Sequence, residues 1–176
     1  MIAALWLMAA QGMLGAFDTA YYHEYRARLP AGGSRTRTEL WLHAVRDFIY
    51  ACFFCTLPFI TWSGRFAIAL FTLVAAEIVI TMADFAVEVK AREPIGVLPG
   101  ERVTHGLMAI VYGAMLANLA PRAWVWMDGP TAWQHVVYDV PVALTFALVA
   151  MGVGVFGSGL RDAYAALDLP NGRYPW

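Results

Sequence analysis

Charged residues are scarce in this chain of 176 residues, because Asp, Glu, Lys and Arg together make up only 14% of it. A soluble domain has about 25%. Neither sign is in excess, since twelve basic and thirteen acidic residues give a net charge of -1. Without a basic surface there is no electrostatic basis for binding DNA or RNA, so we exclude nucleic acid as a partner. Cysteine is limited to Cys52 and Cys55, one helical turn apart in an apolar run, which does not support a disulfide framework.

Hydrophobic residues make up 60% of the chain and fall in runs of about twenty, the length that crosses about 30 Å of hydrocarbon as a helix. The sequence therefore predicts an all-α integral membrane protein, a single transmembrane domain over residues 1–176. The first run has no basic residues before it and no convincing cleavage site, so we interpret it as a retained helix. We expect five membrane-spanning helices and a C-terminal tail, at about residues 1–25, 39–62, 65–90, 101–120, 133–158 and 159–176.

Basic residues collect in alternate loops, which indicates the orientation, because cytoplasmic loops are the ones that retain Lys and Arg. Only Arg65 and Arg122 lie in the other two loops, and Arg46 lies within a span. We therefore expect an outside N-terminus and a cytoplasmic C-terminus in the inner membrane of a bacterium. The cytoplasmic side would hold Arg26, Arg28, Arg35, Arg37, Lys90, Arg92, Arg102, Arg161 and Arg173.

Acidic and histidine side chains collect at the cytoplasmic ends of the first four predicted helices. Ionisable residues inside a membrane are rare and are functional by default. Residues four apart share a helix face, which pairs Glu39 with His43 and Glu101 with His105. Nine residues are candidate metal ligands: Asp18, His23, Glu24, Glu39, His43, Asp84, Glu88, Glu101 and His105.

The first helix fits this site less well than the others. On an ideal helix His23 and Glu24 point away from Asp18. We expect them to reach the site only if the helix ends or unwinds near Tyr21. Glu24 is also typical of a solvated helix end, and that simpler interpretation stays open.

A deeper layer holds four candidate catalytic residues, Arg46, Tyr50, Glu77 and Tyr112. An unpaired guanidinium would cost about 2.5 to 3.5 kcal/mol in the centre of a membrane helix. We therefore expect Arg46 to neutralise Asp18 or Glu77 beneath the metals without contacting them. Tyr50 and Tyr112 also fit simple core positions with satisfied hydroxyl groups.

Several carboxylates cannot stay ionised together at low dielectric unless cations neutralise them. Imidazole nitrogen with carboxylate oxygen suits iron, manganese or zinc. The sequence therefore predicts two divalent metal ions, with iron favoured. Ferritin-like bundles hold such pairs with Glu-x-x-His motifs, whereas this chain has Glu-x-x-x-His at Glu39/His43 and Glu101/His105. Glu39 and Glu101 also fit first-turn charges that complement a helix dipole.

Four motifs, taken together, resemble those of a group of small, uncharacterised bacterial integral membrane proteins. They are D-T-x3-H-E from Asp18, E-L-x-L-H-x2-R from Glu39, D-F-x2-E from Asp84 and E-R-x2-H from Glu101. The resemblance covers about the first two-thirds of the chain. It implies a shared site and no particular activity.

The function that we predict is a membrane di-metal oxidoreductase, similar to an oxidase, hydroxylase or desaturase. Its substrate would be a lipid, a quinone or another apolar molecule from the bilayer, and a di-iron site would need an electron donor. Three alternatives stay open: a zinc-dependent membrane hydrolase, an ion- or proton-coupled transporter, and a b-type haem protein with His43 and His105 as axial ligands.

Overall fold

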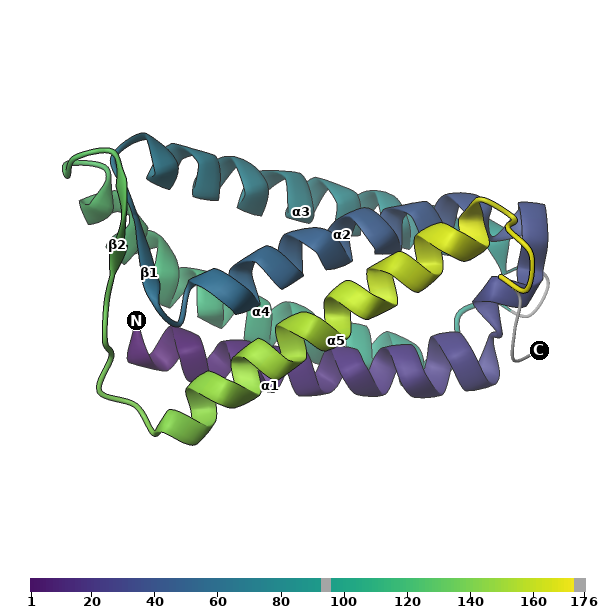
Figure 1. Ribbon diagram of the computed structural model, residues 1–176. Helices are drawn as coiled ribbons and strands as arrows, with labels where there is room; N and C mark the ends of the chain where they lie inside the picture. Colours follow the sequence, from purple (N-terminus) through teal and green to yellow (C-terminus); the bar gives the residue numbers. More distant parts are fainter. Residues whose placement is uncertain (93–95, 173–176) are drawn as a thin grey trace.

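The structure is a computed structural model that describes residues 1–92 and 96–172, and it is mainly helical (Figure 1). The predicted all-α class is therefore confirmed. Arg173, which we assign to the cytoplasmic side, lies outside the described residues. The elements in chain order are α1 (Ile2–Phe17), the π-helix η1 (Asp18–Arg26), the 3-10 helix η2 (Leu29–Arg35), α2 (Arg37–Thr56), β1 (Ile60–Ser63), α3 (Arg65–Ala91), α4 (Pro99–Trp126), β2 (Ala132–His135) and α5 (Val142–Ala166).

Four helical segments are long and apolar enough to cross a membrane: Ile2–Arg26, Arg65–Ala91, Pro99–Trp126 and Val142–Ala166. The helix α2 is not among them, because its 20 residues include Glu39, Arg46 and Asp47. It packs against α5 and α3 and lies between them in Figure 1. The most polar helix is thus shielded by apolar ones. The five spans and the orientation stay predictions.

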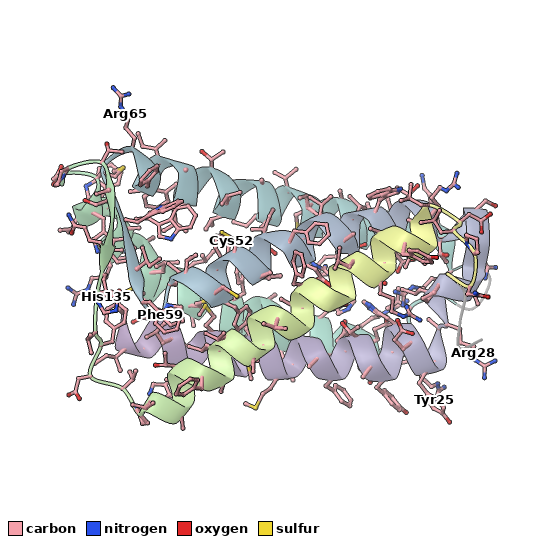
Figure 2. All side chains as sticks on the ribbon, in the orientation of Figure 1. Tyr25, Arg28, Cys52, Phe59, Arg65 and His135 are labelled. Carbon is pink, nitrogen blue, oxygen red and sulfur yellow. The ribbon has the colours of Figure 1, made fainter. Side chains whose placement is uncertain are left out.

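A two-stranded antiparallel sheet closes one end of the bundle. β1 pairs with β2 in the register Ile60↔His135 and Trp62↔Trp133. Trp133 also stacks on Phe66, with ring centroids 5.0 Å apart. His135, Phe59 and Arg65 mark this end in Figure 2. The sheet ties the turn after α2 to the loop before α5.

The sheet accounts for two predicted boundaries that were wrong. The second helix ends at Thr56 and not at 62, because Pro58 lacks the N–H that would continue the helix and residues 60–63 form β1. The fifth helix spans 142–166 and not 133–158, because residues 132–135 form a strand and Pro141 directly precedes the helix. The predicted tail therefore begins inside α5, which places Arg161 and Asp162 on a helix.

The fourth helix is also longer than predicted. It runs through Pro121 to Trp126, whereas we expected it to end at 120. A proline inside a helix removes one backbone hydrogen bond but does not always end it. Ser63 and Gly64, at the far end of β1, hydrogen-bond to the carbonyl oxygen of Trp126 and hold this extra turn against the sheet.

The interior of the bundle has two unlike halves. Towards the sheet it is apolar, with Leu5, Phe53, Leu70 and Leu148 among its buried side chains. At the opposite end, the ends of η1, α3 and α5 meet the starts of α2 and α4 (Figure 1). Nitrogen- and oxygen-bearing side chains gather between the helices near that end, which Tyr25 and Arg28 mark in Figure 2.

The predicted orientation can be tested by cysteine accessibility at two exposed positions, Ser34 in η2 and Asp128 beyond α4. Each position is changed to Cys in a chain whose own cysteines are replaced by Ala. In sealed right-side-out vesicles, a membrane-impermeant maleimide should label Asp128→Cys at once and Ser34→Cys only after the vesicles are lysed. The opposite order of labelling would place the polar end of the bundle outside.

Candidate metal centre

The π-helix at the end of the first span brings Asp18 and His23 together. In a π-helix the backbone bonds join residues five apart, and Ala27 N–H donates to the Tyr22 carbonyl oxygen at 2.8 Å in this way. Asp18 and His23 are also five apart, and Asp18 Oδ2 lies 3.2 Å from His23 Nε2. We expected His23 to reach the site only if the helix ended or unwound near Tyr21; the helix instead changes to a π-helix at Asp18 and continues to Arg26.

The first group of possible ligands is Asp18, His23 and His105. Asp18 Oδ2 lies 3.3 Å from His105 Nε2, so this one oxygen faces a ring nitrogen from η1 and another from α4. His23 Nε2 is also 3.5 Å from Glu101 Oε1. One ligand atom from each of the three residues lies within 4.8 Å of the other two, close enough for one metal ion.

The second group is Glu39, His43 and Asp84, from α2 and α3. His43 Nε2 lies 3.0 Å from Asp84 Oδ2, and the three ligand atoms again fall within 4.8 Å of one another. All three side chains are buried. The His43 ring stacks on the His23 ring, with centroids 4.6 Å apart. The first and second groups are therefore neighbours.

The third group, Glu88, Glu101 and His105, shares His105 with the first. His105 Nδ1 lies 3.8 Å from Glu88 Oε1, while its Nε2 faces Asp18. The Phe85 ring stacks on the His105 ring, with centroids 5.2 Å apart. The two nitrogens of His105 thus connect the first group with the end of α3.

Arg92 is a buried cation in the centre that sequence reasoning missed. Its guanidinium pairs with Glu39 from α2 and with Glu101 from α4, and lies 3.8 Å from Glu88 Oε2. Burial opposes its charge, but the carboxylates of Glu39 and Glu101 outweigh burial and hold the pKa of Arg92 above its usual value. Arg92 therefore stays charged and joins three helices.

The partner of Arg46 differs from the one we predicted. Its Nη1 lies 3.0 Å from Asp84 Oδ2, the same oxygen that faces His43. The expectation that Arg46 neutralises Asp18 or Glu77 by direct pairing was therefore wrong. The reason is geometric, because Asp84 on the neighbouring α3 comes within reach of both His43 and Arg46, which lie one turn apart on α2.

Glu24 does not join the three groups. It pairs with Arg161 of α5 at 2.5 Å. Asp162, also on α5, does reach the centre, with Oδ2 3.7 Å from His43 Nδ1. We had assigned this residue to a cytoplasmic tail. Its spacing from the apolar run of α5 could have shown that the helix continues.

Several buried oxygens of the centre lack a hydrogen-bond donor among the residues that the structure describes. They are Asp18 Oδ1, Glu39 Oε2, Asp84 Oδ1 and Glu88 Oε2. A buried acceptor without a partner is costly, and a cation removes that cost. The donor set of imidazole nitrogen and carboxylate oxygen therefore fits divalent metal ions.

Charge leads to the same requirement. In the described part of the chain, the five carboxylates of the three ligand groups pair with two guanidinium groups, those of Arg46 and Arg92. The other three negative charges are balanced by bound cations, by imidazolium ions or by protonation of the carboxylates. A histidine that binds a metal ion is neutral, so bound metal would replace imidazolium at that position. The carboxylates are Asp18, Glu39, Asp84, Glu88 and Glu101.

A smaller polar group lies deeper in the bundle. Glu77 is buried and its Oε1 accepts hydrogen bonds from Tyr50 at 2.7 Å and from Thr81 at 2.8 Å. The Tyr112 ring meets the Tyr50 ring edge-on at 6.1 Å. Three of the four candidate catalytic residues thus form one cluster, while Arg46 lies between this cluster and the metal centre through its bond to Asp84.

Comparison of the chain with protein families, with curated proteins and with solved structures finds no match. The resemblance of the four sequence motifs to a group of membrane proteins therefore stays a prediction.

Arg92→Met should destabilise the protein, because it leaves Glu39 and Glu101 buried without a cation. Removing one partner of a buried ion pair costs about 3 to 5 kcal/mol. The free energy of unfolding, measured by titration with sodium dodecyl sulfate, should fall by that amount. Arg102→Met is the matched control, since Arg102 is exposed on the first turn of α4 and should leave stability nearly unchanged. Equal stabilities of the two variants would show that the carboxylates do not depend on Arg92.

Proposed function

We propose that this protein is a membrane-bound di-metal oxidoreductase, with two divalent ions, iron favoured, at one end of its helical bundle. The observation that supports this most directly is the set of buried carboxylate oxygens without hydrogen-bond donors, beside three histidines. Helical bundles with carboxylate-rich interiors hold redox-active metal pairs in this way. Redox chemistry would come from the bound metals, and an electron donor would be a second partner.

The adjacent ligand groups suggest how two ions would be held. Asp18, His23 and His105 would bind one ion, and Glu39, His43 and Asp84 the other. Glu101 lies 3.5 Å from His23 and Glu88 lies 3.8 Å from His105, so both offer further oxygens to the first group. Arg46 would orient Asp84 by the hydrogen bond to its Oδ2.

The deeper cluster suggests a role in proton handling. Tyr50 donates a hydrogen bond to Glu77, and the Tyr112 hydroxyl has no hydrogen-bond partner in the described part of the chain. Glu77 can hold a proton at Oε1 or Oε2 and exchange it with these phenols. This cluster would supply or remove protons during oxidation of an apolar substrate.

The alternatives explain less of the centre. A single zinc ion would occupy one group of three ligands and leave the adjacent group without a metal ion. A transporter needs polar groups on both sides of its site, whereas the half of the bundle towards the sheet is apolar in the described residues. A haem would bind one ring nitrogen each of His43 and His105 and would leave the carboxylates of the centre without a role.

Elemental analysis and an absorption spectrum of purified protein test the proposal. We expect two iron or manganese ions per chain. One zinc ion per chain would favour the hydrolase, and a Soret band would favour haem. Protein that takes up no metal after incubation with ferrous iron, manganese or zinc would overturn the proposal, because protonated histidines would then balance the carboxylates.

Single histidine variants locate the metals. His43→Ala and His105→Ala should each lower the bound metal by at least one ion per chain, because each removes a nitrogen from a different group. His135→Ala is the matched control, since His135 lies on β2 at the other end of the bundle (Figure 2). Metal content is measured against protein concentration in the same sample. Equal metal content in all three variants would contradict binding at this centre.

A further inference from the structure

A buried amide on α1 has no role in the metal centre. Gln11 is 6% exposed, and its Oε1 accepts no hydrogen bond within the described residues. It lies seven residues before Asp18, about 10 Å nearer the middle of the bundle. Leaving a buried amide unpartnered is costly, which indicates that a ligand supplies the partner.

Gln11 lines two cavities that both extend to Asp18. The larger, of about 610 Å³, lies between α1, α2 and α5. The smaller, of about 180 Å³, lies towards α3 and α4 and also borders Glu77 and Tyr112. The larger volume is within the range of small-molecule sites, about 300 to 1,000 Å³. It is therefore the one that can hold a whole ligand beside the metal centre.

The larger cavity opens sideways, between α1 and α5. Its lining residues Ala16 and Ala20 on the first span and Gly154 and Gly157 on α5 are exposed. A Cβ atom at either of the two glycines would meet no other atom within 4 Å. Small residues on both helices thus leave an apolar opening on the side of the bundle that would face lipid.

The polar wall of this cavity disfavours an anionic ligand. Its two arginines are already paired, Arg46 with Asp84 and Arg161 with Glu24. Asp47 adds negative charge to the same wall. A carboxylate or phosphate head group would meet this charge, whereas a neutral hydroxyl group can donate a hydrogen bond to Gln11 Oε1.

We propose that the cavity between α1 and α5 binds a neutral long-chain amphiphile, with its hydroxyl head group donating a hydrogen bond to Gln11 Oε1 and its chain leaving towards the lipid. The inference rests on the proposed function, since the ligand would be the substrate of the metal centre. A membrane quinol and a fatty alcohol share this chemistry.

Photolabelling in phosphatidylcholine vesicles tests the proposal with two matched probes, dodecanol and dodecanoate that carry the same photoreactive diazirine. Labelled peptides are identified by mass spectrometry. We expect dodecanol to label peptides of α1 and α5, and dodecanoate to label them at least tenfold less. Decylubiquinol is added as a competitor, and competition shows that the cavity accepts a quinol. Labelling that survives excess decylubiquinol assigns the cavity to the fatty alcohol.

Cavity-filling variants provide the decisive comparison. Gly15→Leu and Gly154→Leu should each reduce dodecanol labelling at least tenfold, because both positions line the cavity and have room for a Cβ atom. Gly106→Leu is the control, since this position lines neither cavity and is equally open. Gln11→Leu should weaken labelling about three- to tenfold, the effect of one hydrogen bond.

The outcomes separate this inference from the proposed function, because metal content is measured on the same samples. Protein that contains metal but is labelled equally in Gly15→Leu, Gly154→Leu and Gly106→Leu would overturn the cavity site. Stronger labelling by dodecanoate would overturn the neutral head group. Labelling with the expected pattern in protein that binds no metal would support the cavity as a ligand site and refute the di-metal function alone.

Discussion

Opposite charge must be supplied to every buried carboxylate, and this constraint organises the polar end of the bundle. The carboxylates come from the first span, α2, α3 and α4, so each cation that pairs with two of them also joins helices. Arg92 at the end of α3 connects α2 to α4, and Arg46 connects α2 to α3. Such pairs add little net stability when they replace good apolar packing, but they fix geometry. The positions of the ligands therefore depend on the arginines.

The two halves of the interior support each other. The apolar half and the sheet hold the helices in register, which the polar half cannot do without its counter-charges. The sheet pairs residues 60–63 with 132–135 and so restrains the helices at the end away from the centre. The ends that hold the ligands are connected by few backbone hydrogen bonds, apart from those inside the helices. Side-chain ion pairs therefore fix the positions of the ligands in the centre.

Much of the architecture could be predicted from the sequence, because apolar runs and residues four apart follow directly from helix geometry. That reasoning brought Glu39 and His43 to the centre together, and likewise Asp84 with Glu88. It failed where the backbone departs from an ideal helix, or where the position of a helix boundary decides whether a residue lies inside the bundle. Asp162 was missed because the start of α5 was placed nine residues early, whereas β2 and Pro141 delay it.

Arg92 was missed for a different reason. Its sequence neighbours suggest a basic loop, and only the packing of Glu39 and Glu101 against the end of α3 shows that it is buried. From its sequence position alone, a basic residue next to a polar loop can be either exposed in the loop or buried in the bundle. The partner of Arg46 could likewise not be predicted from the spacing of residues on α2, because pairing between α2 and α3 depends on their relative shift along the bundle. Distances between helices are not encoded in the spacing within one helix.

The polarity of α2 has a consequence for how the chain enters a membrane during synthesis. The charges of Glu39, Arg46 and Asp47 make α2 a poor segment for independent insertion, since each charge near the centre of a helix costs about 2.5 to 3.5 kcal/mol. Its successor α3 is strongly apolar and carries Asp84, the partner of Arg46. Only a short turn and β1 separate the two helices. We expect the ribosome to deliver α2 and α3 as one hairpin, with α2 waiting at the membrane surface until α3 has emerged to neutralise it.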